Sequence, residues 1–271
     1  MVDCDGRAAL EEIFRKASQE NRAVLLPYLT AGLPDPISSL ELFVAMAEAG
    51  ADGFEVGIPY SDPLMDGPTI HEAGLAALRS GTSLGGGLEI AGAVAKETGK
   101  PVIAMSYVNP VLRIGIEKFA TRSAELGISA VILADLPVDE SAPFQEAFDA
   151  AGLGTVLFVA PTTGMERLRA VVQAEPVFLY GIAEVGVTGE REEASQRVGD
   201  LAASVRSVTD IPLVLGVGIS TPDHAARAAA VADGVIVGSA LVRRVLDAPD
   251  VASATESLSS AVSDLAKAVR V

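Results

Sequence analysis

The sequence has little of what several classes of protein require. It contains one cysteine, Cys4, among 271 residues, so it predicts neither a disulfide framework nor a cysteine-ligated metal site. It has no apolar run of about 18 residues or more, the length that a membrane-spanning helix needs. Its first residues are acidic and polar, unlike a signal peptide, and we therefore expect a soluble cytoplasmic protein.

Positive charge is also in short supply. Lys and Arg number 20 against 36 Asp and Glu, which gives a formal net charge of −16 at pH 7. A surface this acidic repels nucleic-acid phosphates and anionic membranes, so neither is an expected partner. A phosphate ligand would therefore have to be held by local backbone N–H groups.

The few lysines and histidines are not placed for Schiff-base catalysis or for metal binding. No lysine stands at the carboxyl end of a predicted strand, so a Schiff-base mechanism lacks a nucleophile; the lysines are Lys16, Lys96, Lys100, Lys118 and Lys267. His71 and His224 fall in separate helical segments, and Asp62 and Asp66 stand in a loop. We therefore predict no metal site.

What the sequence does contain is a regular alternation of short apolar runs and helical patterns. Eight candidate strands cover residues 23–29, 53–56, 102–106, 130–134, 155–159, 177–180, 213–215 and 234–237. Helical patterns follow them, for example at residues 38–49, 116–126, 142–151, 166–173 and 222–231. Another helix, near residues 8–18, precedes the first strand and would cover the bottom of a barrel. Eight such units, separated by single helices, predict a (β/α)₈ TIM barrel with an extra N-terminal helix.

The main alternative architecture is an open, doubly wound sheet. Its first strand usually leads into G-x-G-x-x-G, whereas residues 30–36 here read TAGLPDP, with two prolines. No linker divides the chain, so residues 1–271 are predicted to form one domain. Residues 85–87, three glycines, are predicted to be a flexible loop before a helix, remote from the active face.

Two carboxylates, Glu55 in the second strand and Asp66 in the loop after it, are candidate functional residues. Glu55 alternates with Phe54 and Val56, so it should point away from the covering helices, flanked on its own face by Gly53 and Gly57. A semi-buried carboxylate has a raised pKa and can give and take a proton near neutral pH. A hydrogen bond to a neighbouring loop would be its structural explanation. Asp66 ends the following loop and can equally be explained by an Asp-Gly turn.

Further candidates follow other strands, at the end of the barrel where active sites lie. Tyr107 follows the third strand, Asp135 the fourth, and Tyr180 ends the sixth. Either tyrosine can also be explained as a packing residue, and Asp135 as a residue that fixes its own loop.

Three glycine-containing loops follow the last three strands, at residues 186–189, 216–220 and 238–240. Glycine lets backbone N–H groups approach an anion, and the helix that begins after Gly238 and Ser239 adds its positive end. Barrels commonly bind phosphate after strands seven and eight, so we predict a phosphate site there. Together these features favour acid–base chemistry on a phosphorylated substrate without a cofactor.

The chain resembles the tryptophan synthase α subunit family over residues 23–246. The resemblance rests on EVGIPYSDPLMDGPTI at residues 55–70, PYLTAG at 27–32, DLP at 135–137, GVTG at 186–189, GIS at 218–220 and GSA at 238–240. It implies cleavage of indole-3-glycerol phosphate to indole and glyceraldehyde 3-phosphate by a retro-aldol reaction, in the last steps of tryptophan biosynthesis. The chain departs from the family pattern at Ala183 and Glu184, where Ser-Arg is usual. It also departs at Val217, where an aromatic residue is common.

The resemblance also implies roles for particular residues. Glu55 would be the general acid and base and Asp66 the second catalytic carboxylate. The residues expected around the substrate are Tyr180, Tyr107 and Tyr28 at the indole pocket and Gly189, Gly218, Gly238 and Ser239 at the phosphate. The chain itself would use no cofactor. Its expected partner is a β subunit that carries pyridoxal phosphate, in an α₂β₂ tetramer, contacted through residues 58–63 and the turn at Asn109 and Pro110.

Three alternatives remain open at this point. A stand-alone lyase would use the same site but release free indole quickly without a partner. A non-catalytic subunit would only activate the β chain, although it would not need Glu55 or Asp66. Another phosphate-binding barrel enzyme, such as a sugar-phosphate isomerase, would want a Lys or His at the barrel mouth, which the sequence does not offer.

Overall fold

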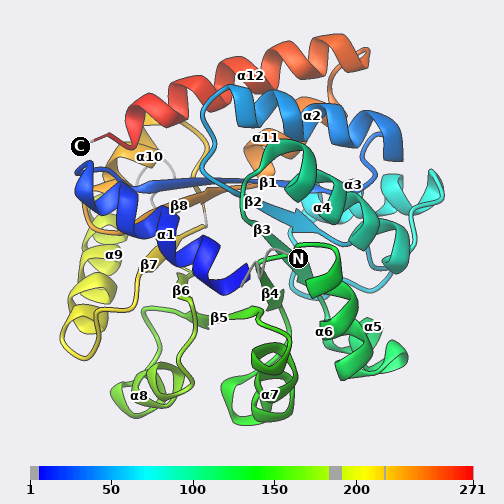
Figure 1. The fold of residues 1–271 in the computed structure, drawn as a ribbon. Helices are drawn as coiled ribbons and strands as arrows, with labels where there is room; N and C mark the ends of the chain where they lie inside the picture. Colours follow the sequence, from blue (N-terminus) through cyan, green and yellow to red (C-terminus); the bar gives the residue numbers. More distant parts are fainter. Residues whose placement is uncertain (1–5, 183–190, 217, 271) are drawn as a thin grey trace.

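Eight parallel strands in sequence order form a closed barrel, with β8 paired to β1. The computed structural model describes residues 6–182, 191–216 and 218–270. Figure 1 shows the strands inside a layer of helices, which confirms the predicted TIM barrel. The strands are β1 (Val24–Thr30), β2 (Phe54–Gly57), β3 (Val102–Ser106), β4 (Ala130–Leu133), β5 (Gly154–Val159), β6 (Phe178–Gly181), β7 (Leu213–Leu215) and β8 (Gly234–Val237).

The N-terminal helix α1 (Gly6–Gln19) covers the end of the barrel where the strands begin. It buries Leu10, Phe14 and Ala17, whose spacing places them on one face of the helix. The Phe14 ring lies 5.8 Å from the ring of Phe178, the first residue of β6. The opposite end, where the strands finish, is therefore left for a functional site.

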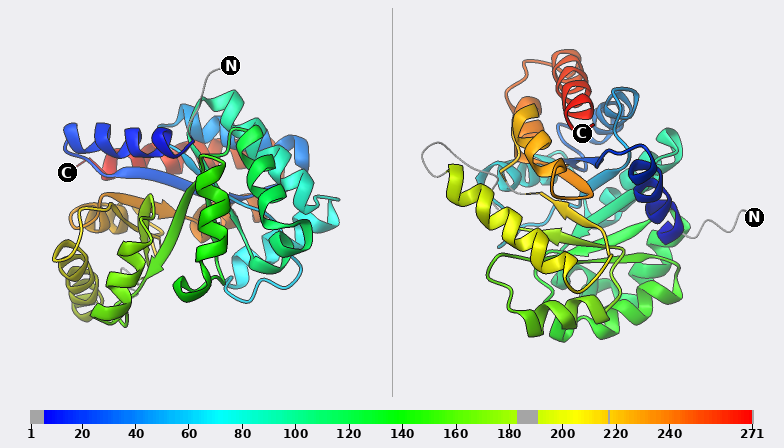
Figure 2. Two further views of the ribbon diagram at one scale, coloured as in Figure 1. Left: turned by 60° about the horizontal axis from the view of Figure 1, so that its bottom comes forward. Right: turned by 90° about the vertical axis from the view of Figure 1, so that its left-hand side faces the viewer.

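The remaining helices surround the barrel, as Figures 1 and 2 show. α12 runs beside α2 on the outside of the barrel, in contact with it. These helices are α2 (Pro36–Glu48), α3 (Pro68–Arg79), α4 (Leu84–Thr98), α5 (Val108–Ile114), α6 (Ile116–Glu125), α7 (Ala142–Ala150), α8 (Met165–Gln173), α9 (Arg191–Arg206), α10 (Pro222–Ala229), α11 (Ser239–Leu246) and α12 (Val251–Ala268), with the short 3₁₀ helix η1 (Val138–Glu140) before α7.

The expectation of single helices between strands was wrong in two places. Two helices, α3 and α4, separate β2 from β3, and α5 and α6 separate β3 from β4. A glycine with positive φ lies at each break, Gly81 at φ 96° and Gly115 at φ 100°. This backbone conformation is strained for other residues, so each glycine lets one helix end and the next begin in a new direction.

The prediction of a flexible loop at residues 85–87 was also wrong, because these glycines form the first turn of α4. Ser83 caps the helix by accepting a hydrogen bond from the Gly86 N–H. A Cβ at Gly87 would lie 3.0 Å from Ile58, so glycine allows α4 to pack closely on the loop after β2. Capping and packing here outweigh the low helix propensity of glycine.

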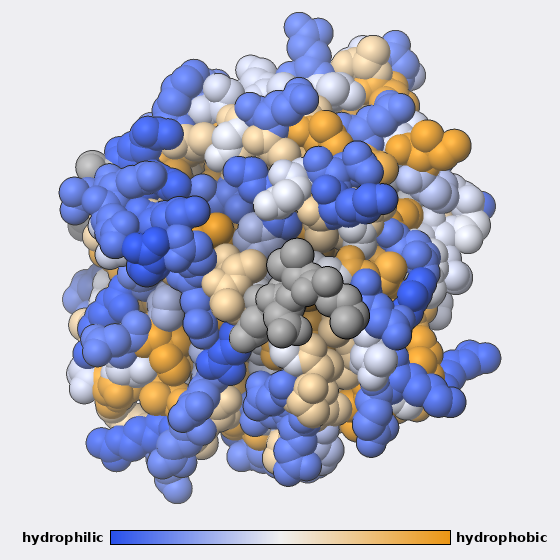
Figure 3. Space-filling model, in the orientation of Figure 1, coloured by the Kyte–Doolittle hydropathy of each residue, from blue (hydrophilic) through white to orange (hydrophobic). Residues whose placement is uncertain are grey.

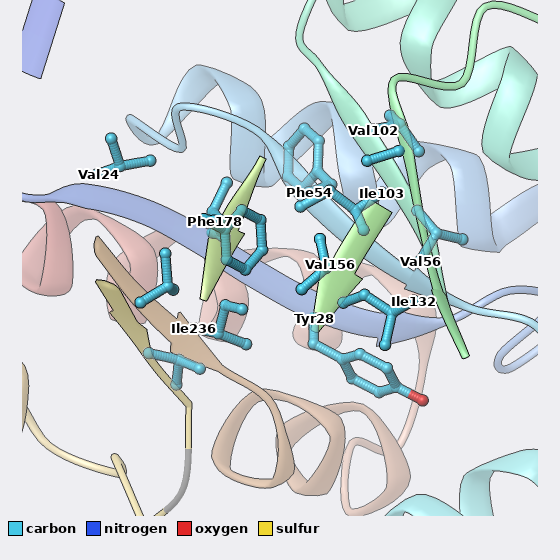
Figure 4. Packing of buried hydrophobic residues seen from close by; sticks show 14 of the residues in the cluster. Val24, Tyr28, Phe54, Val56, Val102, Ile103, Ile132, Val156, Phe178 and Ile236 are labelled. Carbon is cyan, nitrogen blue, oxygen red and sulfur yellow. The ribbon is translucent and has the colours of Figure 1, made fainter. Parts of the chain in front are cut away.

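The strand register decides which side chains enter the barrel. Tyr28 pairs with Glu55, and Glu55 pairs with Ile103, so these three residues share the interior face. Phe54 faces outward, and its ring packs 5.4 Å from that of Phe43 in α2. In Figure 4 the ring of Tyr28 lies at the edge of the buried cluster, with its hydroxyl directed away from the aliphatic side chains. The Tyr28 hydroxyl thus lies where the apolar core ends.

The outer surface reflects the acidic composition. Figure 3 shows a mainly hydrophilic face, on which apolar residues form small patches between polar ones. In the described part of the chain, no helix combines the length and the apolar character needed to cross a membrane.

Candidate active site

A cavity of about 300 Å³ lies where the strands end. Interior positions of β1, β2, β3, β6 and β8 line it, together with the loops after β2, β7 and β8. Its lining residues are Tyr28, Glu55, Met65, Asp66, Gly67, Ile70, Met105, Tyr180, Gly216, Gly218, Ile236, Gly238 and Ser239. Sequence analysis missed Met65, Ile70, Met105 and Ile236, although the alternation along β3 and β8 could have identified Met105 and Ile236.

Glu55 is the buried acid of this cavity. Its side chain enters the barrel from the second position of β2, and the residue is only 2% exposed. Burial, together with a smaller effect of the nearby charge of Asp66, raises the pKa of Glu55 to about 8. Its Oε2 atom has no hydrogen-bond partner among the described residues. Glu55 is therefore protonated near neutral pH and free to act on a ligand.

Asp66 lies across from it, in the loop that joins β2 to α3. The Tyr107 hydroxyl donates a 2.7 Å hydrogen bond to Asp66 Oδ1. Partial burial raises the pKa of Asp66, while this hydrogen bond and the charge of His71 oppose the rise. The two carboxyl groups thus differ: one is buried without a partner at Oε2, and the other is held by a tyrosine.

Two glycines create the space that two tyrosines occupy. A Cβ at Gly57 would lie 2.1 Å from the hydroxyl oxygen of Tyr28, and one at Gly216 would lie 2.2 Å from that of Tyr180. Burial raises the pKa of both tyrosines well above its usual value, and the charge of Glu55 adds to this effect. Both hydroxyls therefore stay neutral and can serve as hydrogen-bond donors in the cavity.

Tyr107 reaches the site indirectly. It stands just before α5, outside the cavity lining, with its ring 5.4 Å from that of Tyr60. Its hydroxyl contacts Asp66, so its influence on a ligand passes through that carboxylate.

The glycine loops after β7 and β8 reach the other side of the cavity. Gly218, Gly238 and Ser239 all line it, and Gly218 has a positive φ of 75°. Gly238 precedes the first turn of α11, which has no side-chain cap. Unpaired N–H groups at such a helix start attract anions. Gly189 and its neighbours at residues 186–188 lie outside the described residues, as do Ala183, Glu184 and Val217.

Asp135 does not line this cavity. It accepts a 2.8 Å hydrogen bond from the Val108 N–H and so ties the loop after β4 to the start of α5. It lines a neighbouring cavity of about 400 Å³, mainly apolar, that shares Met65 with the first. The structural explanation of Asp135 is therefore the better one.

The histidines do not form a metal site in the described part of the chain, where no group of three or more potential ligands occurs. His71 lies in α3, near Asp66, while His224 lies in α10 and contacts the Ser220 hydroxyl at 3.3 Å.

Comparison with known proteins places this arrangement in context. The model of the family described as tryptophan synthase alpha chain matches residues 14–270. The tryptophan synthase alpha chain of Streptomyces coelicolor is 42% identical over 261 residues, which cover 96% of each chain. That of Phenylobacterium zucineum is 39% identical and covers 98% of this chain and 96% of its own.

Solved structures agree with the sequences. A chain of Mycobacterium tuberculosis tryptophan synthase superimposes with a TM-score of 0.88 at 39% identity, covering 97% of this chain and 98% of its own. The tryptophan synthase subunit alpha of Legionella pneumophila gives a TM-score of 0.85 at 31% identity, with 96% and 98% coverage.

Proposed function

The chain belongs to the tryptophan synthase alpha chain family, and on that premise we propose how its cavity carries out the family's reaction. That reaction, the alpha reaction of tryptophan synthase, is a lyase reaction: indole-3-glycerol phosphate is cleaved to indole and glyceraldehyde 3-phosphate. The bond between indole C3 and the glycerol chain breaks, and its electron pair returns to the ring. Carbon C3 must gain a proton, and the adjacent glycerol hydroxyl must lose one.

Glu55 performs both proton transfers in this proposal. Because burial raises its pKa to about 8, it is protonated before the reaction and can give its proton to C3. The resulting carboxylate then accepts the proton of the glycerol hydroxyl, so Glu55 ends the cycle as it began. The buried, unpartnered Oε2 of Glu55 is the single observation that carries this assignment.

Asp66 has the complementary role. Protonation of C3 places positive charge on the indole ring, and a carboxylate near the ring N–H stabilises that charge. The hydrogen bond from Tyr107 supports this role because it favours the ionised form of Asp66 and fixes its orientation.

The two ends of the substrate fit different walls of the cavity. We propose that the phosphate lies at Gly218, Gly238, Ser239 and Gly189, where the start of α11 offers backbone N–H groups. The indole ring then lies against Tyr180 and Tyr28, and the apolar side chains of Met105 and Ile236 complete this part of the cavity wall. An acidic chain can thus bind a phosphate locally, despite its unfavourable overall field.

The family also implies a partner, the β subunit, and we propose that the two form an α₂β₂ tetramer in the cytoplasm. A cavity of about 630 Å³ next to the active-site loop is lined by Pro59, Tyr60, Asn109 and Pro110, the segments expected at this contact. Ile114, an apolar residue that is 38% exposed, also lines it. Pyridoxal phosphate belongs to the partner in this proposal, and the chain itself needs no cofactor.

The decisive experiment measures indole release from indole-3-glycerol phosphate by the purified chain, with and without its cognate β subunit. Slow release that rises many-fold with the partner supports the coupled α subunit. Fast release that the partner leaves unchanged points to a stand-alone lyase. If no indole appears in either case while the β subunit is activated, the chain is a non-catalytic subunit; if neither occurs, the proposed function is wrong.

A further inference from the structure

One arginine joins the two helices that begin at the active site. Arg243 lies in α11, and its Nη2 donates to Thr69 Oγ1 at 3.1 Å and to Glu72 Oε2 at 2.9 Å, both in α3. Its Nη1 also lies 3.6 Å from Oδ1 of Asp247, the residue that follows α11 at its C-cap. The guanidinium therefore bridges the first turns of α3 to the middle of α11.

Both helices begin beside residues of the cavity lining. α3 begins at Pro68, directly after Asp66 and Gly67, and α11 begins at Ser239. Neither helix has a side-chain hydrogen bond at its N-cap residue. The position of the first turn of α3 must therefore be set by its packing and by contacts such as the one from Arg243 to Thr69.

We propose that Arg243 is a positioning residue, which holds the loop carrying Asp66 in register with the phosphate-binding start of α11. It touches neither the substrate nor the reacting atoms in this proposal. It acts through α3, so that the distance between the ring-stabilising carboxylate and the bound phosphate is fixed. The proposal rests on the proposed function, because it assumes that these two ends bind one substrate.

The charges around Arg243 indicate that it links two helices and is more than one partner of an isolated surface ion pair. Glu72 in α3 and Asp247 at the C-cap of α11 both face the Arg243 guanidinium. If Arg243 is made neutral, two carboxylates remain on facing helices and repel each other. The stability gained from an exposed pair is small, so the main consequence lies in the relative position of the helices.

Arg244, the next residue, provides a matched control. Its Nη1 donates to Ser257 Oγ of α12 at 2.9 Å. Arg243→Gln and Arg244→Gln thus remove the same charge from the same helix, and only the first breaks the link to α3.

The experiment compares the two variants, together with Arg243→Lys and Glu72→Gln, in the full chain bound to its cognate β subunit. Steady-state indole release gives kcat and KM, and calorimetry with glycerol 3-phosphate measures the phosphate end alone. We expect Arg243→Gln to lower kcat by about three- to tenfold, because small errors in position slow catalysis strongly. Its affinity and stoichiometry for glycerol 3-phosphate should stay as in the wild type, which a partly unfolded protein would not show.

The other variants complete the test. Arg243→Lys should recover part of the lost kcat, Glu72→Gln should reproduce part of the loss, and Arg244→Gln should match the wild type. An unchanged kcat in Arg243→Gln, an equal loss in Arg244→Gln, or weaker glycerol 3-phosphate binding at unchanged kcat would each overturn the proposal. If the wild-type complex itself releases no indole, the proposed function has failed, independently of Arg243.

Discussion

Two carboxylates three residues apart, Asp52 and Glu55, have opposite surroundings. Asp52 stands just before β2, where its Oδ2 accepts hydrogen bonds from the Leu25 N–H at 2.9 Å and from Arg22 Nη1 at 2.8 Å, and its Oδ1 accepts one from Arg22 Nη2 at 3.0 Å. Glu55 lies inside β2, and its Oε2 atom has no partner in the part of the chain that the structure describes. Where the strands begin, hydrogen bonds occupy both carboxylate oxygens of Asp52. Where the strands end, Glu55 Oε2 can still bind a ligand.

The same contrast extends around the barrel. At the end where the strands begin, Asp233 accepts hydrogen bonds from the Leu213 N–H and from Arg206. At the end where they finish, Asp66 is hydrogen-bonded by a neutral tyrosine hydroxyl. Carboxylates that join strands to one another stabilise the fold, whereas buried carboxylates without an ion pair keep the raised pKa values that catalysis needs.

The sharpest way to test the catalytic side is Glu55→Gln. We expect indole release to fall by about 10²- to 10⁴-fold, because the amide can neither give nor accept the proton. Glycerol 3-phosphate binding should persist, since the start of α11 is unchanged. Steady-state assays and calorimetry measure both properties, and a variant that keeps comparable turnover would refute the role of Glu55.

The raised pKa of Glu55 should appear in the pH dependence of the free energy of unfolding. The folded pKa of Glu55, about 8, is raised above its ordinary value of 4.5, so the folded state binds the proton more tightly than the unfolded state. The stabilising effect of that proton is present below pH 4.5 and is lost as the pH rises through 8, by an amount on the order of a few kcal/mol. Urea unfolding should show Glu55→Gln gaining stability relative to the wild type between pH 5 and pH 9. A constant difference across this range would contradict the raised pKa.

The structural side is tested by Asp52→Asn. This change removes the charge that pairs with half-buried Arg22 and weakens the bond to the Leu25 N–H. We expect a loss of about 1–3 kcal/mol in the free energy of unfolding, measured with urea at pH 7. At a temperature where the variant stays folded, kcat should equal that of the wild type. A lower kcat with unchanged stability would reverse the contrast between the two ends.

The smallest expected effect concerns Tyr107→Phe. The ring can still pack on Tyr60, but Asp66 loses its hydrogen bond. Because that bond lowers the pKa of Asp66, its loss should raise the pKa and move the acid limb of the kcat profile to higher pH. At neutral pH we expect a fall in kcat of about threefold to tenfold. An unshifted acid limb would indicate that Asp66 does not set it.

The sequence predicts most of the fold because buried parallel strands are continuous apolar runs. The predicted limits of the third, seventh and eighth strands match β3, β7 and β8. The glycine run at residues 85–87 misled us, because its helical state depends on the Ser83 cap and on contact with Ile58, and propensity alone does not contain these.

The candidate site was predicted less evenly. Glu55 and Tyr180 were expected at strand ends, Asp66 in the loop after the second strand, and Tyr28 from the family resemblance; the structure brings all four to one cavity. The role of Tyr107 as a partner of Asp66 and the bridge from Arg243 to α3 could not be foreseen. Both depend on side chains from distant segments, whose meeting is fixed by packing and not by spacing along the chain.

The tight fit of Tyr28 against Gly57 has a consequence for redesign of this cavity. With 2.1 Å between the tyrosine hydroxyl and the place of a Cβ at position 57, a side chain at position 57 requires that Tyr28 shift or become smaller. The pair Tyr28→Ala and Gly57→Ala would remove a large ring from β1 and add only one methyl group to β2. The double variant would therefore enlarge the cavity on the β1 side, which offers more space to a substituted indole ring. The two positions should therefore be randomised as a pair in any library of variants.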